Sequence, residues 1–207
     1  MTTNADKLKA LKSIDVSYLT KTEAKEFTVL LEELEKREFQ EKSTSTFMNF
    51  VKAIWSDFIE GDHHYKMAEA FDKIAEGKLK RLIINMPPRH TKSEFASHLF
   101  PAYLLGKNPR LKIIEATHTA DLAINFGRKV RDLIDRDDYN ELFPDTALKA
   151  DSRSAGKWLT NKGGNITRQV QGVLWQVGVR ICSLLMIPIP SKMPCPIKPW
   201  TMLTSGT

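Results

Sequence analysis

The sequence predicts an α/β protein, in which a helical N-terminal region precedes a parallel sheet with flanking helices. Up to Gly77, apolar residues recur at the three- and four-residue spacing of helices. After Gly77 the pattern changes to short β-branched runs, which are typical of buried strands. These runs alternate with helical segments, an order that builds parallel sheets with right-handed crossovers. We expect a helical region at 1–76, a partial α/β domain at 77–165 and a tail at 166–207.

Three helices are expected in the N-terminal region, at about 22–42, 46–59 and 63–75. Thr22 is the expected N-cap of the first helix, because acidic residues follow it in the first turn. One face of the second helix is aromatic, and it is interpreted as a core face, with a surface for stacking bases as the alternative. That face is formed by Phe47, Phe50, Val51, Ile54, Trp55 and Phe58.

Asp62, His63 and His64 stand together where the third helix begins. Such a cluster can bind a metal ion, but no further ligand follows at a convincing spacing. A solvated helix start is therefore the favoured interpretation.

The composition excludes several classes of protein. The chain has 207 residues, of which 42% are hydrophobic and 27% are charged. No apolar run approaches the roughly 18 residues that a membrane span needs, and the N-terminus has no signal pattern. Cys182 and Cys195 form neither a disulfide framework nor a metal motif, as expected for a reducing compartment.

The residues that indicate chemistry follow an expected strand at 80–86. Two prolines stop this strand, and a new helix opens within 89–94. A strand, a tight turn, a Lys-Ser pair and a helix start are the layout of a phosphate-binding loop. In such a loop, backbone N–H groups hold phosphate oxygens, the lysine reaches the terminal phosphates and the hydroxyl binds Mg²⁺. Lys92 and Ser93 stand at those two places.

The loop departs from the usual pattern G-x-x-x-x-G-K-[ST], since Met86 and Thr91 replace its two glycines. Its context supports the phosphate interpretation, because a second strand at 111–117 and a helix from about 119 follow it. The alternative for Lys92 is a solvated lysine, but a cation is unfavourable at a helix N-terminus without an anion nearby. Arg89 is either a second phosphate contact or solvated. Three histidines are expected to be structural or solvent-facing: His90, His98 and His118.

Taken together, several segments between residues 60 and 165 resemble the ATPase domain of the large terminase subunit of tailed phages and prophages. The segments are HHYKMAEAF at 63–71, IINMPPRHTKSE at 83–94, FPAYLLG at 100–106, ATHTADL at 116–122 and FGRKVRDL at 126–133. The resemblance implies a P-loop NTPase fold followed by a nuclease, and ATP-driven packaging of DNA into procapsids. It implies ATP and Mg²⁺ as cofactors. The implied partners are double-stranded viral DNA, the small terminase subunit and the portal of the procapsid, in the host cytoplasm and without a membrane.

The resemblance also assigns residues. Lys92 matches the P-loop lysine and Arg89 the extra basic residue of the family's loop, so these two are the implied catalytic residues. Ser93 matches the hydroxyl that binds Mg²⁺. Nucleotide binding is implied for the whole loop, which consists of Pro88, Arg89, His90, Thr91, Lys92 and Ser93.

An ATPase of this kind also needs a later apolar strand that ends in two carboxylates, one for Mg²⁺ and one for water. No acidic residue here ends an apolar strand in the required order, and the nuclease part is missing. We therefore expect an incomplete P-loop NTPase, impaired as an enzyme.

A frameshift near residue 165 is our interpretation of this loss. Codons exist for 165–194 that, read one base earlier, encode a glycine-rich segment and then Ile-Ile-Asp-Asp-Pro-His, which resembles the family's acidic strand. One of these aspartates is required by the amino-acid sequence, whichever synonymous codons are used. Met186 is encoded by ATG and the codon of Ile187 begins with AT, so that the shifted codon is GAT, for Asp.

Because of this frameshift, the segment 166–207 is interpreted as an aberrant tail. It is expected to be disordered and not to extend the sheet. It has no acidic residue and holds five of the ten prolines. Its basic residues supply +4 of the net charge of +6: Arg168, Arg180, Lys192 and Lys198. The alternative function is a non-enzymatic basic protein that uses 166–207 to bind nucleic acid or a partner.

Overall fold

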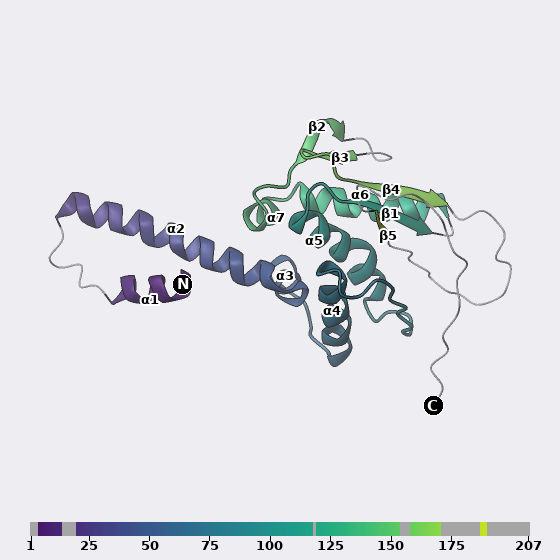
Figure 1. Ribbon diagram of the computed structural model, residues 1–207, viewed down its shortest axis with the longest axis horizontal. Helices are drawn as coiled ribbons and strands as arrows, with labels where there is room; N and C mark the ends of the chain where they lie inside the picture. Colours follow the sequence, from purple (N-terminus) through teal and green to yellow (C-terminus); the bar gives the residue numbers. More distant parts are fainter. Residues whose placement is uncertain (1–3, 14–19, 118, 154–157, 171–186, 190–207) are drawn as a thin grey trace.

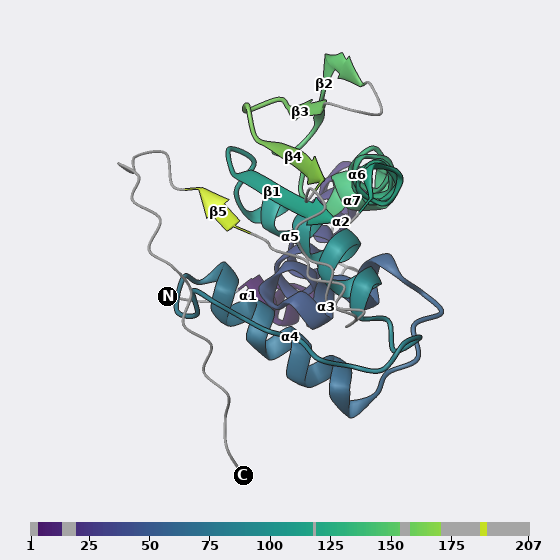
Figure 2. The ribbon, with the colours of Figure 1, turned by 90° about the vertical axis from the view of Figure 1, so that its right-hand side faces the viewer.

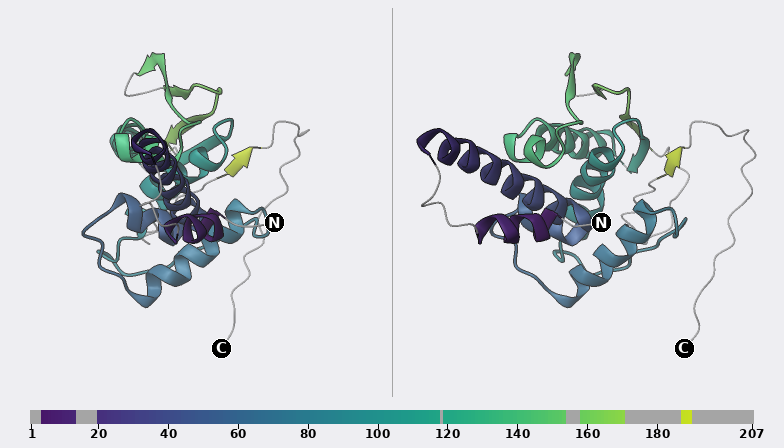
Figure 3. Two further views of the ribbon diagram at one scale, coloured as in Figure 1. Left: turned by 90° about the vertical axis from the view of Figure 1, so that its left-hand side faces the viewer. Right: turned by 60° about the vertical axis from the view of Figure 1, so that its left-hand side comes forward.

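The computed structural model describes residues 4–13, 20–117, 119–153, 158–170 and 187–189. The chain forms an α/β body from which a long helix projects (Figure 1). Helices α1 (Asn4–Lys12) and α2 (Lys21–Ser45) lie side by side in this projection, as two further views confirm (Figure 3). An ion pair of 2.8 Å between Lys12 and Glu35 joins them. The expected helical N-terminal region is thus confirmed.

Helix α2 begins at a different residue from the one that the sequence predicts. Its N-cap is Thr20, whose hydroxyl accepts from the Glu23 N–H while the Glu23 carboxylate accepts from the Thr20 N–H at 2.8 Å. The expected N-cap, Thr22, is wrong because this reciprocal arrangement requires an acidic or amide side chain three residues later. Thr20 is followed at that distance by Glu23, whereas Thr22 is followed by Lys25.

Helix α3 (Phe47–Ile54) and helix α4 (Asp62–Ala75) form the centre of the body with their apolar faces. The expected core face of α3 is confirmed, but the helix ends at Ile54 and not near residue 59. Beyond it, Trp55 and Phe58 lie in a turn in which their ring centroids are 5.3 Å apart. This turn lets Phe58 pack against Phe95, at 5.5 Å, which a continued helix would not allow.

The core is centred on the fully buried Phe47. Its ring makes edge contacts with four others, whose centroids are 5.2–5.6 Å away and which belong to three different helices: Phe71, Phe95, Phe100 and Tyr103. The Phe47 N–H also donates to Asp72 Oδ1 of α4 at 2.8 Å. Burial raises the pKa of Asp72.

The expected strand at 80–86 is not a strand of the sheet that the described residues form. Leu82, Ile84 and Met86 pack against the core, whereas Ile83 is 89% exposed. A strand needs a neighbour along its backbone, and the two edges of strand β1 (Lys112–Thr117) are taken by β4 (Asn165–Val170) and β5 (Ile187–Ile189). The expected buried strand at 80–86 is therefore wrong, because its side chains alternate between the core and solvent and no described strand pairs with it.

Two helical segments follow the loop at 88–93. A π-helix, η2 (Glu94–Leu99), continues into α5 (Phe100–Lys107), and the Phe100 N–H donates to the carbonyl of Phe95. Pro101 lies at the start of α5 and has no N–H to donate to the preceding turn. A wider turn is a usual response to such a lost bond.

The described strands form a mixed sheet in the order β2-β3-β4-β1-β5, where β2 is Leu148–Arg153 and β3 is Trp158–Thr160. Only β1 and β4 are parallel, and their connection contains helices α6 (Ala120–Ile134) and α7 (Asp137–Leu142). The expected all-parallel sheet is wrong because β3 and β4 are joined by a short turn at Gly163, with φ 87°, and short turns join antiparallel strands.

The expected boundary at residue 165 falls inside the sheet. Residues 165–170 form β4, where Arg168 stands in register with Glu115 of β1, and 187–189 form β5 on the opposite edge of β1 (Figure 2). The expectation that 166–207 would not extend the sheet is therefore wrong for these residues. The reason is local: Ile166, Thr167 and Val170 are β-branched residues, which favour strands, and the hydrogen bonds between strands are made by the backbone. Disorder is expected for the whole of 166–207, and within this range 171–186 and 190–207 lie outside the described residues.

Within the described segments, no helix combines the length and the apolar character that crossing a bilayer requires.

Replacement of Phe47 by alanine tests whether this ring is the centre of the core. Phe47→Ala removes a fully buried ring from four edge contacts, so we expect the free energy of unfolding to fall by about 3–5 kcal/mol. Urea unfolding followed by circular dichroism measures it. The matched control is Phe39→Ala on α2, where the ring is 57% exposed, with an expected loss within about 0.5 kcal/mol. Equal losses in the two variants would contradict this description of the core.

Candidate functional site

The loop at 88–93 connects the segment 80–86 to the π-helix, and its last two residues, Lys92 and Ser93, are already helical. The backbone before them is unusual. Arg89 has φ 66° and Thr91 has φ 54°, while His90 between them does not share the positive sign. Left-handed residues occur in the backbone turns whose successive N–H groups form concave anion sites. Thr91 lies in the left-handed region that glycine favours, although β-branched residues rarely do so.

The helix after the loop begins with free backbone donors. The carbonyl of Thr91 accepts the N–H of Phe95 at 2.9 Å, which is the first bond of the helical pattern. The N–H groups before Phe95 have no helical partner, because the first turn of any helix lacks acceptors. These donors and the positive end of the helix face the loop, where the sequence predicts a phosphate.

Two cations on this loop have no anionic partner. Within the described part of the chain, neither Lys92 Nζ nor the Arg89 guanidinium forms an ion pair or a hydrogen bond with a side chain. Arg89 is exposed, whereas Lys92 and Ser93 are half-buried. Uncompensated positive charge next to a helix N-terminus is unfavourable, and an anion in the loop would relieve it.

An open pocket of about 440 Å³ adjoins the loop. It is lined by Ile54, Trp55, Arg89, Thr91, Glu94, His98, Leu99 and Arg136. The volume lies within the range of small-molecule sites. Of the predicted site residues, the structure brings Arg89 and Thr91 to this pocket, while Pro88, His90, Lys92 and Ser93 lie on the loop outside its lining.

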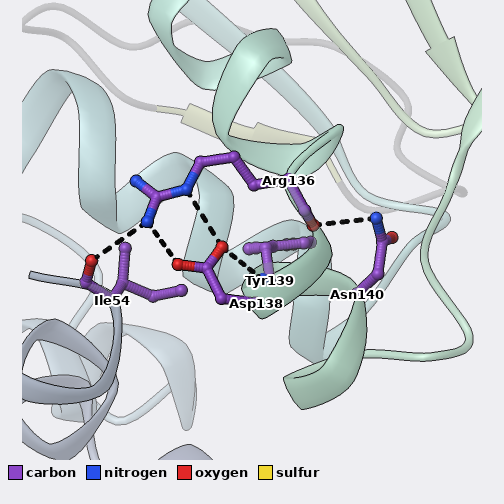
Figure 4. Close-up of polar contacts among 5 residues, drawn as sticks. All are labelled: Ile54, Arg136, Asp138, Tyr139 and Asn140. Atoms are coloured by element: carbon purple, nitrogen blue, oxygen red, sulfur yellow. Dashed lines mark hydrogen bonds and ion pairs between the residues drawn. The ribbon is translucent and has the colours of Figure 1, made fainter.

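The two arginines of the pocket differ in their partners. Arg136 makes a two-pronged ion pair with Asp138, and its guanidinium also reaches the carbonyl of Ile54 at 3.4 Å (Figure 4). Asp138 in turn accepts the N–H of Tyr139 at 2.8 Å. Arg136 thus joins α7 to the end of α3, and only Arg89 is available to a ligand.

Glu94, directly after the loop, is held by two partners. Its carboxylate lies 2.6 Å from His98 Nδ1 and 2.9 Å from Lys129 Nζ of α6. The hydrogen bond from His98 and the added contact with Lys129 lower the pKa of Glu94 to about 2, against the opposing effect of burial. Glu94 is therefore an ionised anchor between the π-helix and α6, and it is not available as a proton donor at neutral pH.

The histidines are placed differently from the prediction. His64 is 5% exposed, so the expectation of a solvated helix start is wrong for this residue, and its ring packs between Phe58 and Phe95. His98 is structural, as expected, and His118 lies outside the described residues. Among the described residues, no group of three His, Cys, Asp or Glu side chains could hold a metal ion.

Sequence reasoning missed three residues near the loop: His64, Trp55 and Arg136. His64 Nε2 lies 2.6 Å from Thr91 Oγ1, although the two are 27 residues apart. No motif joins these positions, because the contact depends on how α4 packs beneath the loop.

No family model, curated protein or solved structure matches the chain.

The anchor at Glu94 predicts a specific pH dependence. A folded-state pKa near 2, below the ordinary 4.5, means that the ionised carboxylate stabilises the fold above pH 4.5, and that this stabilisation is lost as pH falls toward 2. Glu94→Gln should lower the free energy of unfolding by about 1–2 kcal/mol at pH 7, and this difference should shrink below pH 4.5. Thermal unfolding of both proteins between pH 3 and pH 7 measures it.

The matched control is Glu69→Gln, which removes an exposed carboxylate paired with Lys73. We expect little change in stability at either pH. A difference between wild type and Glu94→Gln that stays constant with pH would contradict the assigned pKa.

Proposed function

We propose that the loop at 88–93 binds the phosphates of ATP. The observation that carries the proposal is a pair of cations, Arg89 and Lys92, that have no partner among the described residues and lie on a loop with two residues of positive φ at a helix N-terminus. Backbone N–H groups hold the phosphate oxygens, and Lys92 neutralises the terminal phosphates. Arg89, at the mouth of the pocket, makes a second phosphate contact.

Mg²⁺ enters this proposal with the nucleotide and not as a resident ion. Ser93 supplies one hydroxyl, and the described residues provide no cluster of further ligands. Mg²⁺ is commonly bound through one or two protein oxygens together with substrate phosphates and water. When bound, the ion would neutralise charge on the phosphates, and Ser93 would hold it by its hydroxyl.

We further propose that the chain is the N-terminal ATPase part of the large terminase subunit of a phage or prophage. The support is the resemblance of the five segments between residues 60 and 165, together with the agreement between the loop's conformation and its proposed task. The proposed substrate of the motor is double-stranded viral DNA in the host cytoplasm. The proposed partners are the small terminase subunit and the portal of the procapsid.

Hydrolysis by this chain should be negligible. Attack on the terminal phosphate requires a carboxylate that positions water opposite the loop. The acidic residue nearest to the loop in sequence, Glu94, is engaged by His98 and Lys129. We therefore expect weak binding of Mg·ATP and turnover below about 1 s⁻¹.

The phosphate site is tested by replacing Lys92. In wild type, Mg·ATP at about ten times its Kd should raise Tm by about 3 °C or more, whereas AMP should not, because it lacks the outer phosphates. Lys92→Ala should abolish the shift. The matched control is Lys66→Ala, an exposed lysine of α4, which should keep it. An equal shift in the Lys92 and Lys66 variants would contradict the proposal.

The second candidate, a basic nucleic-acid-binding protein, is favoured by the absence of acidic residues from 166–207. It predicts DNA binding that weakens steeply with salt and is lost in the triple variant Arg180→Gln, Lys192→Gln, Lys198→Gln. These changes keep the chain at full length and leave β4 and β5 unaltered. Binding that survives them, or that is absent from wild type, would contradict the second candidate.

The nucleotide sequence around codon 165 tests the proposed frameshift. Read one base earlier, it should encode a glycine-rich segment and then two aspartates after Ile-Ile. A stop codon in the shifted reading, or codons without an acidic pair, would show that the tail is native.

A further inference from the structure

His64 lies beneath the phosphate loop and makes one polar contact with it. The side chain projects from the first turn of α4 and is 5% exposed, and its Nε2 is 2.6 Å from Thr91 Oγ1. The ring is fixed by Phe58 and Phe95, whose centroids are 4.8 and 5.0 Å from it. A buried ring held on both sides is a rigid point from which to position a loop.

The direction of this hydrogen bond follows from the second partner of the threonine. Thr91 Oγ1 is 2.8 Å from the carbonyl oxygen of His90, which can only accept. The hydroxyl therefore donates to this carbonyl and accepts from the Nε2–H of His64. His64 Nδ1 is buried and has no hydrogen-bond partner among the described residues, so a neutral ring with its proton on Nε2 fits the site. Burial, with the neighbouring His63 and His90 adding to it, lowers the pKa of His64 and favours this neutral form.

Thr91 needs such a partner because its backbone conformation is unfavourable. Its φ of 54° is in the left-handed region, where glycine is free of strain and a β-branched residue is not. The residues that follow depend on it, since its carbonyl begins the helical pattern. If Thr91 relaxed to a negative φ, the path of the loop into the helix would change.

Resting on the proposed function, we propose that His64 is a positioning residue for the phosphate loop. By donating from Nε2 to the Thr91 hydroxyl, it holds Thr91 in the left-handed conformation and thereby keeps the loop ready for a triphosphate. The pair replaces the conformational freedom of the missing glycine with a fixed hydrogen bond. Thr91 and His64 should then depend on each other, and a glycine at position 91 should make His64 dispensable.

A double-mutant cycle on the full-length chain tests this dependence, with Mg·ATP affinity measured by calorimetry well below Tm. His64→Leu removes the donor and should weaken binding about tenfold. His64→Gln keeps an N–H at a similar position and should restore most of the affinity. In the Thr91→Gly background, His64→Leu should change the affinity by less than about twofold.

Two further measurements separate the possible outcomes. Phe71→Leu alters another buried ring of α4, which stacks on Phe100 at 4.3 Å. Phe71→Leu should lower Tm without changing the affinity for Mg·ATP. If the role of His64 were purely structural, His64→Leu would also lower Tm and leave this affinity unchanged. Without nucleotide, the Tm losses of His64→Leu and Thr91→Gly should be non-additive.

Equal affinity of wild type and His64→Leu, or additive Tm losses in the absence of nucleotide, would overturn the inference. The same weakening by His64→Leu in both backgrounds would also overturn it. If wild type bound no Mg·ATP, the proposed function would fail, and the Tm cycle alone would then decide whether His64 holds Thr91.

Discussion

The packing of aromatic rings around Phe47 is the constraint on which the rest of the body depends. This ring contacts Phe71 of α4, Phe95 of η2, and Phe100 and Tyr103 of α5, so one side chain fixes three helices relative to α3. The loop at 88–93 lies directly before η2 in the chain, and His64 reaches it from α4. The position of the loop relative to its supporting histidine is therefore set by hydrophobic packing and not by the loop itself.

Charge is distributed in a way that distinguishes the loop from its surroundings. Arg136 and Lys129 are both cations near the pocket, and each is paired with a carboxylate, Asp138 or Glu94. Arg89 and Lys92 have no such partner among the described residues. Pairing stabilises the framework, and the unpaired cations leave a positive loop that an anion can neutralise. This contrast is the physical reason for assigning ligand binding to the loop and a structural role to its neighbours.

Local features of the fold could be predicted from the sequence where local chemistry decides them. The aromatic spacing of α3 correctly indicated a core face, and α6 begins after its Thr119 N-cap, close to the predicted start. Features that depend on distant partners could not be predicted. The segment 80–86 pairs with none of the described strands, and β4 pairs across the expected boundary because backbone bonds form independently of side-chain identity.

In the candidate site, too, residues in one local pattern could be predicted, whereas contacts between distant residues could not. Lys92, Arg89 and Thr91 could be selected from a local pattern of residues, a turn followed by a Lys-Ser pair and a helix start. His64 could not be found, because its hydrogen bond to Thr91 joins residues 27 apart and arises only when α4 packs under the loop. Nor does the sequence indicate that Arg136 is engaged by Asp138, since many neighbouring charges on a protein surface do not pair.

The most direct test of the central claim is amide hydrogen exchange of the full-length chain with and without Mg·ATP. If the loop binds phosphates through its backbone, exchange of the amides at 89–94 should slow when Mg·ATP is added, while the exposed turn at Gly77 should not change. The same protection should be produced by inorganic triphosphate, because the claim concerns phosphate and not the base. Unchanged exchange at 89–94 under saturating nucleotide, or protection confined to another segment, would contradict the account.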